Sequence, residues 1–245
     1  MQLAKYKLMQ VNHSGRKFMA SKKLRGLVSE YLGSFTLGVA VIGSGLMAQN
    51  LTDDRAVMLV INVIGTVFGL AIAISIFSQI GAAHFNPIVS LWYFSRGKLT
   101  FAETLQLILF QVLGFITSVG VINFSFGGDS FQQATQARTG TGQFIGEVIA
   151  SAGLIFVLNA VNRSDVRGGP QVWVPIWIGA AMFFTPSTSF ANPALTLARS
   201  FTNSFTGISP DSVIGFVLAQ LVGLLVGGLL IMYIYQMRFK KPKVA

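Results

Sequence analysis

Six apolar stretches, most of them about 20 residues long, recur along this chain of 245 residues. They cover residues 27–48, 57–79, 104–126, 143–161, 171–185 and 212–236. A helix of about 20 residues crosses the roughly 30 Å of hydrocarbon in a bilayer. With 52% hydrophobic and 11% charged residues, the chain is too apolar for an ordinary soluble domain. The sequence therefore predicts an all-α membrane protein with six transmembrane helices, of which the fifth is the weakest by length.

The net charge of +10 would suggest a nucleic-acid partner in a soluble protein, but here the positive residues cluster just outside the apolar stretches. If both termini are cytoplasmic, nearly all Lys and Arg lie on the cytoplasmic side of the membrane. Arg55 and Arg138 lie on the outer side, and the side of Arg199 is left open. We therefore predict no nucleic-acid partner and a multi-pass protein of a cell membrane, such as a bacterial inner membrane. The expected parts are a basic cytoplasmic N-terminal tail (1–26), a membrane domain (27–237) and a basic C-terminal tail (238–245).

Little in this sequence could perform catalysis or bind a metal. The chain has no cysteine and only two histidines, His13 and His84, which excludes a disulfide framework and leaves little for a metal centre. Gly-x-Ser-x-Gly, His-Glu-x-x-His and a phosphate-binding loop are absent, and the acids within apolar stretches are the isolated Glu30 and Glu147. We therefore predict no metal, no cofactor, no enzymatic activity and no proton-coupled transport.

An Asn-Pro pair occurs at the start of a short apolar segment in each half of the chain, as Asn86-Pro87 and Asn192-Pro193. Asparagine caps a helix start, and proline is tolerated at the first helical position because that N–H has no partner. One isolated Asn-Pro is more often a simple cap, but two at corresponding places favour a common role. The nine residues that begin at each asparagine make about 14 Å of helix, so two such half-helices end to end roughly span the hydrocarbon.

The two halves share one order of features, which is an acidic residue inside an apolar stretch, then Asn-Pro, then a polar segment before another stretch. The acids are Glu30 and Glu147, and the repeats cover about 27–126 and about 143–237. Three spans in each half force opposite orientations, so the re-entrant half-helices enter from opposite sides and meet near the midplane. A buried carboxylate could relay protons, but we assign both glutamates to holding the unwound backbone before each half-helix.

From about Leu24 to Phe239 these features resemble the aquaporin (major intrinsic protein) family. The first family motif resembles residues 81–90, with Ile88 where alanine is usual, and the second is intact as Asn192-Pro193-Ala194. The resemblance implies six spans, two half-helices, one pore in each subunit and a homotetramer that passes water and small uncharged solutes across the lipid bilayer. Ile88 could narrow the pore, which leaves the alternative of a poorly conducting membrane structural protein with the same fold.

The usual pore arginine of the family directly follows the second Asn-Pro-Ala, where this chain has Leu195. Arg199 lies one helical turn later, about 6 Å nearer the outside. The resemblance implies that Thr66, Ala180 and Ser189 complete the constriction, with a shift of a residue or two left open for Ala180. These small residues predict a wide filter that admits glycerol-like polyols. The position of this arginine, one turn after the usual one, is similar to that in an arsenic-associated bacterial branch of the family. This similarity implies neutral metalloid hydroxides such as arsenous acid as solutes.

The two asparagines and the half-helix ends predict how ions are excluded. Asn86 and Asn192 can each donate a side-chain N–H to a passing oxygen, and each helix N-terminus adds a partial charge of about +0.5. His84 could line the cytoplasmic side and titrate as a gate, or it could steady the loop through a hydrogen bond. Arg199 could face the pore or extend to water at the interface, and we favour the pore.

Overall fold

The computed structural model describes residues 2–164 and 166–236, with side chains from Lys22 onward, and this part of the chain contains no strand. The helices are α1 (Gln2–Leu51), α2 (Arg55–Phe77), α3 (Pro87–Ser95), α4 (Phe101–Ser125), α5 (Thr141–Val161), α6 (Pro170–Phe184), α7 (Pro193–Ala198), the 3-10 turn η1 (Arg199–Phe201) and α8 (Pro210–Ile234). The all-α prediction is therefore confirmed.

Five of these helices are long and apolar enough to cross a membrane, namely Lys22–Leu51 within α1, then α2, α4, α5 and α8. The predicted fifth span is α6, an apolar helix of 15 residues that begins at Pro170 and contains Pro175. At 1.5 Å per residue it is about 22 Å long, which is short for a full crossing. Residues 185–192 are not helical and connect α6 to α7. The crossing that begins with α6 is therefore made partly of helix and partly of loop.

The first helix is longer than the sequence predicts. It is continuous from Gln2 to Leu51, so the expected boundary between a tail and the membrane domain at residue 26 falls inside a helix. The expected C-terminal tail at 238–245 lies outside the described residues.

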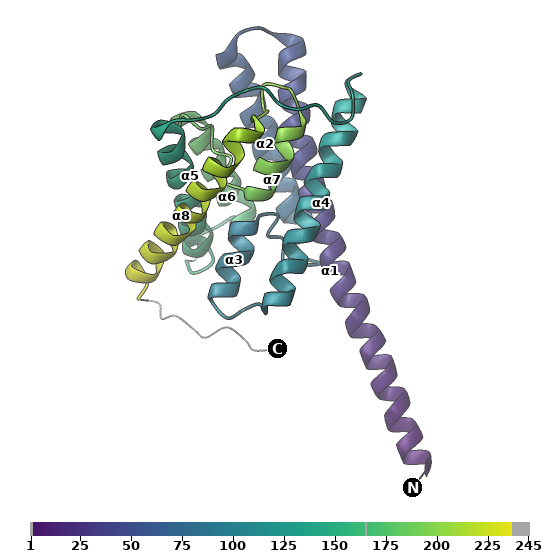
Figure 1. Ribbon diagram of the computed structural model, residues 1–245. Helices are drawn as coiled ribbons and strands as arrows, with labels where there is room; N and C mark the ends of the chain where they lie inside the picture. The colour runs from purple at the N-terminus through teal and green to yellow at the C-terminus, as the bar shows by residue number, and fades with distance from the viewer. Residues whose placement is uncertain (1, 165, 237–245) are drawn as a thin grey trace.

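The helices pack in two matching groups, in which α1 contacts α2 and α4, and α5 contacts α6 and α8, while α2 and α6 join the groups. Figure 1 shows the short helices α3 and α7 inside the bundle, with α3 in the lower half and α7 in the upper half. Glycines allow the closest approaches: a Cβ at Gly114 of α4 would clash with the backbone of Tyr31, and one at Gly227 of α8 would clash with that of Ala152. A glycine thus allows close helix packing at the corresponding contact of each half, between α1 and α4 and between α5 and α8.

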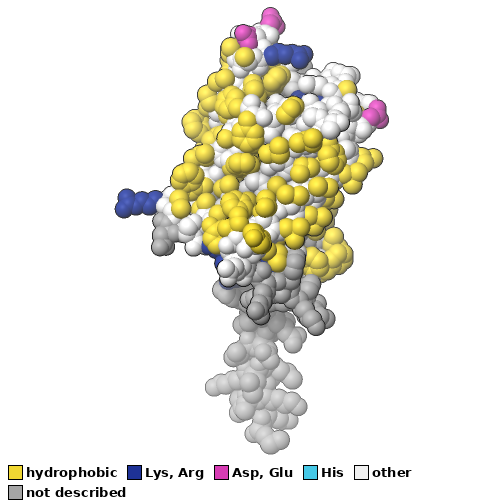
Figure 2. Space-filling model, turned by 90° about the vertical axis from the view of Figure 1, so that its left-hand side faces the viewer, with side chains coloured by type: hydrophobic (Ala, Val, Ile, Leu, Met, Phe, Trp, Pro, Cys, Tyr) yellow, Lys and Arg dark blue, Asp and Glu magenta, His cyan; other side chains and the backbone are white. Residues whose placement is uncertain are grey.

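The outer surface of the bundle is apolar. Figure 2 shows hydrophobic side chains over most of one face, with Lys, Arg, Asp and Glu gathered toward its two ends. Large apolar side chains such as Phe68 (63% exposed), Leu109 (55%) and Leu225 (65%) point outward from three different spans. A surface of this kind is stable only in hydrocarbon, as the sequence predicts.

Candidate pore

Asn86 and Asn192 cap the two half-helices, and the prolines that follow occupy the first helical positions. The Asn86 side-chain oxygen accepts from the N–H of Ile88 at 3.1 Å. The Asn192 oxygen accepts from Ala194 at 3.1 Å and from Leu195 at 3.2 Å. Each asparagine oxygen is therefore bonded to its own helix, which directs the amide nitrogen away from it.

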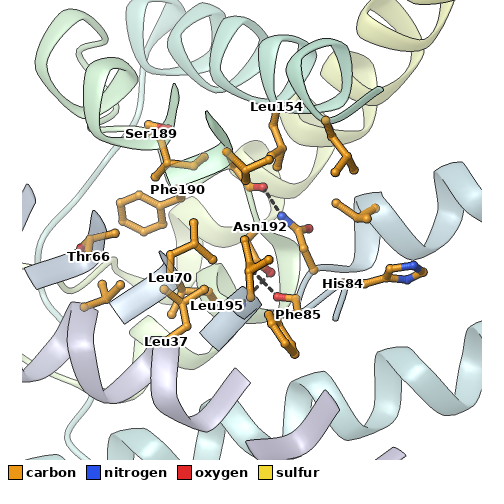
Figure 3. Close-up of a pocket in the computed structure, with 18 of the residues that line it drawn as sticks. Leu37, Thr66, Leu70, His84, Phe85, Leu154, Ser189, Phe190, Asn192 and Leu195 are labelled. Carbon is orange, nitrogen blue, oxygen red and sulfur yellow. Dashed lines mark hydrogen bonds between the residues drawn. The ribbon is translucent and has the colours of Figure 1, made fainter. Parts of the chain in front are cut away.

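The amide nitrogens cross between the two halves of the molecule. Asn86 Nδ2 donates to the carbonyl of Ala191 at 2.7 Å, and Asn192 Nδ2 donates to the carbonyl of Phe85 at 2.8 Å (Figure 3). An asparagine amide has two N–H groups, so this exchange uses one from each residue and leaves one more for a permeant oxygen. The half-helices are thus joined at the place where they can also act on a solute.

The two buried glutamates bind the loops that lead into the half-helices. Glu30 accepts from the backbone N–H groups of His84 at 2.5 Å and Phe85 at 3.1 Å. Glu147 accepts from those of Phe190 at 2.8 Å and Ala191 at 2.9 Å. Both carboxylates are fully buried. They supply the acceptors that an irregular backbone inside a membrane requires.

Gln111 of α4 and Gln220 of α8 complete these networks, and sequence reasoning missed both. Gln111 Nε2 donates to Glu30 at 3.4 Å and to Ser90 Oγ at 2.9 Å. Gln220 Nε2 donates to Glu147 at 2.6 Å and to the hydroxyl of Thr196 at 2.8 Å. Ser90 and Thr196 each lie four residues after their asparagine. The available signal was a glutamine inside the third apolar span of each half.

Several loop residues before the asparagines have positive φ angles although they are not glycine. They are Ala83 (50°), Phe85 (47°), Thr188 (57°), Ser189 (48°) and Ala191 (45°). A left-handed conformation costs an L-residue about 1–2 kcal/mol. The glutamate hydrogen bonds offset this strain, because they satisfy N–H groups that would otherwise be buried without a partner.

A cavity runs between the two halves along these loops. Figure 3 shows Thr66, Ser189 and Phe190 at one end of it and His84 at the opposite end, with Asn192 between them. Its remaining wall is mostly apolar and includes Leu37, Val41, Leu70, Ile74, Leu154, Leu158, Val174, Ile178 and Met182. A cavity with apolar walls and few polar groups suits the passage of small neutral molecules.

Four of the five predicted filter residues line this cavity: Thr66, Ser189, Leu195 and Arg199. Thr66 Oγ1 and Ser189 Oγ are buried and have no hydrogen-bond partner among the described residues. Ala180, for which the sequence leaves open a shift of a residue or two, is exposed on α6. Met182, two residues later on the same helix, lines the cavity and is 4% exposed.

The remaining predicted residues lie beside the cavity or at the end opposite Thr66. Ile88 is fully buried in the hydrophobic core and is not among the lining residues, so its side chain does not narrow the passage. Ala194, at the corresponding place in the second motif, is 2% exposed. His84 lines the cavity, its Nδ1 lies 3.0 Å from Ser90 Oγ, and its ring lies 4.6 Å from that of Tyr93. It is therefore both cavity-facing and hydrogen-bonded.

The described part of the chain has no group of three or more His, Asp or Glu residues that could hold a metal ion. The polar groups along the cavity are amides, hydroxyls, backbone groups, one histidine and one arginine. These groups can exchange hydrogen bonds with a passing solute.

Comparisons with known proteins agree with this geometry. The family model for the major intrinsic protein matches residues 17–191. Aquaglyceroporin AqpS of Rhizobium meliloti (strain 1021) is 41% identical over 199 residues, which cover 81% of this chain and 85% of that protein. Aquaporin TIP1-1 of Arabidopsis thaliana is 27% identical over 162 residues, which cover 64% of each chain.

A solved structure shows the same fold. The X-ray structure of the aquaglyceroporin from Plasmodium falciparum superimposes with a TM-score of 0.63 at 18% identity, covering 87% of this chain and 95% of that one. With six apolar helices in the bundle, two capped half-helices that meet through crossed asparagines, and a family model that matches most of its length, the chain belongs to the major intrinsic protein, or aquaporin, family.

Proposed function

We propose that this chain is a passive channel for water and small uncharged solutes such as glycerol-like polyols. The observation that carries the proposal is the cavity between the halves, which passes both crossed asparagines and ends at the unpartnered hydroxyls of Thr66 and Ser189. Passage needs donors and acceptors that replace part of the hydration of the solute, and these groups supply them. Flux then follows the concentration gradient.

We include neutral metalloid hydroxides such as arsenous acid among the proposed solutes. Leu195 stands where the family has its pore arginine, so the constriction carries an apolar side chain at that point. A wider and less polar ring favours uncharged solutes larger than water. A relative at 41% identity bears the name aquaglyceroporin, which agrees with passage of polyols.

Ions and protons are excluded in this proposal by the two half-helix N-termini and the asparagines between them. Each N-terminus carries about +0.5 of partial charge, and the asparagine that caps each one lines the cavity. A central water that accepts from both asparagines cannot pass a proton along its chain. Neutral molecules do not meet this electrostatic barrier.

We further propose a homotetramer in a cell membrane with both termini in the cytoplasm and no enzymatic activity. The start of α1 and the end of α8 lie at the same end of the bundle (Figure 1), and the Lys and Arg of the sequence are concentrated toward the chain termini. The alternative of a poorly conducting structural protein is not favoured, because Ile88, which motivated it, lies outside the cavity wall.

Stopped-flow light scattering of proteoliposomes tests the channel directly. Shrinkage in sucrose measures water, and re-swelling in glycerol, boric acid or arsenous acid measures the solutes. We expect all four to be faster than in empty liposomes, with an uncoupler leaving net uptake unchanged. Shrinkage and swelling no faster than in empty liposomes would support the structural alternative.

A single cysteine at the outer end of the cavity should make the channel sensitive to mercurials. The native chain contains no cysteine, so we expect it to be insensitive. Thr66→Cys places a thiol in the cavity wall at a hydroxyl that has no hydrogen-bond partner to lose. We expect a thiol-reactive mercurial to block water and glycerol flux, and a reducing thiol to restore it. Ser75→Cys, exposed on the same helix, is the control that should stay insensitive.

Enlarging Leu195 should exclude solutes before it excludes water. Leu195 is 4% exposed and lines the cavity, so Leu195→Phe extends a larger side chain into the passage. We expect the ratio of glycerol to water permeability to fall by about tenfold, since a small steric change in a pocket has effects of this size. Leu197→Phe, on the same helix but 38% exposed, should leave the ratio unchanged. An equal effect of both variants would contradict a filter at Leu195.

A further inference from the structure

Two arginines from different parts of the chain lie over the ring of Phe190. The guanidinium carbon of Arg199 is 3.3 Å from the ring centroid, and that of Arg138 is 5.0 Å from it. A guanidinium over an aromatic face is attracted by the negative charge of that face. Phe190 is 3% exposed and lines the outer end of the cavity, where Figure 3 shows it near Thr66 and Ser189. The ring thus lies beside the proposed filter and contacts its arginine.

Two contacts fix the position of the Phe190 ring. It packs edge-on against Phe216 of α8, with 5.0 Å between the ring centroids, and Phe216 is 2% exposed. The backbone N–H of Phe190 donates to Glu147 at 2.8 Å, which fixes the loop that carries the ring. The arginine side chain has more rotatable bonds than the ring, so the ring is the fixed partner and the guanidinium is the group that it positions.

Arg138 connects the same ring to the loop after η1. Its Nε donates to the carbonyl of Gly207 at 2.8 Å, and its Nη2 donates to that of Phe205 at 3.0 Å. The residue between these two, Thr206, supplies the carbonyl that accepts from Arg199 Nε. Burial lowers the pKa of the Arg138 guanidinium to about 10, which leaves it charged at neutral pH. Arg138 therefore holds in place the second partner of Arg199, although it is not among the cavity-lining residues itself.

The position of Arg199 decides how much of the passage beside Leu195 is open. Arg199 is 4% exposed and lines the cavity one helical turn from Leu195. Its side chain is long enough to enter the cavity if nothing holds it to the wall. We propose that Phe190 and Arg138 are specificity-determining residues, because together they hold the Arg199 guanidinium against the wall and keep the passage open to solutes larger than water. This inference rests on the proposed channel function.

A double-mutant cycle on the ratio of glycerol to water permeability tests the inference. Once the flux through empty liposomes is subtracted, the ratio does not depend on how much protein is folded or inserted, so a general loss of stability does not change it. We expect Phe190→Leu to lower the ratio by about fivefold, a change that one desolvated cation–π contact can account for. In the Arg199→Gln background the same replacement should leave the ratio unchanged or raise it, because no guanidinium remains to be released.

Three further variants distinguish a role in positioning the Arg199 guanidinium from a general role in the stability of the fold. Phe190→Tyr keeps the aromatic face and should keep the wild-type ratio. Arg138→Gln should lower the ratio in the same direction as Phe190→Leu, although Arg138 does not line the cavity. Arg167→Gln, which removes an exposed positive charge and no contact with Phe190, should leave the ratio unchanged.

An equal effect of Phe190→Leu in both backgrounds, or a wild-type ratio in Phe190→Leu, would overturn the inference while the channel proposal stands. Wild-type liposomes that pass neither water nor glycerol would overturn both proposals. The two failures are therefore distinguishable, since one appears in the wild type and the other only in the variants.

Discussion

Glu147→Ala should unfold the second pore loop and abolish most conduction. Glu147 is fully buried and accepts from the N–H groups of Phe190 and Ala191 and from the side chain of Gln220. Without the carboxylate these three donors are buried in a hydrocarbon environment, and each unpaired donor costs about 1–3 kcal/mol. The sum is about 3 kcal/mol or more, in a protein where about 1 kcal/mol moves the unfolding temperature by 2–4 °C.

We therefore expect the thermal unfolding midpoint of Glu147→Ala in detergent to fall by about 10 °C, with osmotic permeability close to that of empty liposomes. Asp129→Asn is a suitable control, because it also removes a carboxylate but at an exposed loop position. A Glu147→Ala protein with wild-type stability would mean that the loop keeps its conformation by other contacts.

The main features of this molecule could be read from its sequence because they depend on local patterns. Apolar stretches predict spans, and the Asn-Pro pairs predict the helix starts at Pro87 and Pro193, since capping and proline placement are properties of a few adjacent residues. The internal repeat then places both half-helices in one pore. The family resemblance drew on the same residues.

The register of α6 could not be derived in this way. Counting back from Asn192 assumes an even rise, but residues between Thr185 and Asn192 form turns in which Thr185 Oγ1 accepts from the N–H of Ser189 at 3.2 Å. Thr188 and Ser189 also have positive φ angles. These turns shift the cavity-facing position of α6 from Ala180 to Met182, and no periodic pattern in the sequence records such a shift.

Long-range side-chain contacts were also beyond sequence reasoning. A buried Gln111 or Gln220 appears in the sequence only as a polar exception within an apolar span. Arg138 belongs to a loop whose path over the bundle is set by backbone bonds such as that from Ala134 N–H to the Ser200 carbonyl at 3.0 Å. Its contact with Phe190 depends on that path, and loops have no periodicity from which it could be predicted.

Asn192→Asp should turn the channel from one that excludes cations into one that leaks them. An aspartate can cap α7 as the asparagine does, because a carboxylate oxygen can accept from Ala194 and Leu195. It lacks the N–H that Asn192 donates to the Phe85 carbonyl, and it adds a full negative charge where the two helix N-termini supply about +0.5 each. The positive potential at the centre of the cavity is then cancelled.

The size of this effect follows from Coulomb's law. Two unit charges in near contact interact by about 4 kcal/mol at an intermediate dielectric constant, and about 1.4 kcal/mol corresponds to a tenfold change. We therefore expect Na⁺ and proton flux, followed with potential-sensitive and pH-sensitive dyes in proteoliposomes, to rise by at least about tenfold over wild type. Asn203→Asp, which adds the same charge at an exposed position, should leave ion flux at the wild-type level. Asn192→Ser, which retains a capping oxygen without a charge, should lower water flux without an ion leak. If Asn192→Asp excluded cations as well as the wild type does, the barrier would have to lie elsewhere along the cavity, and Arg199 is the next positive charge in its wall.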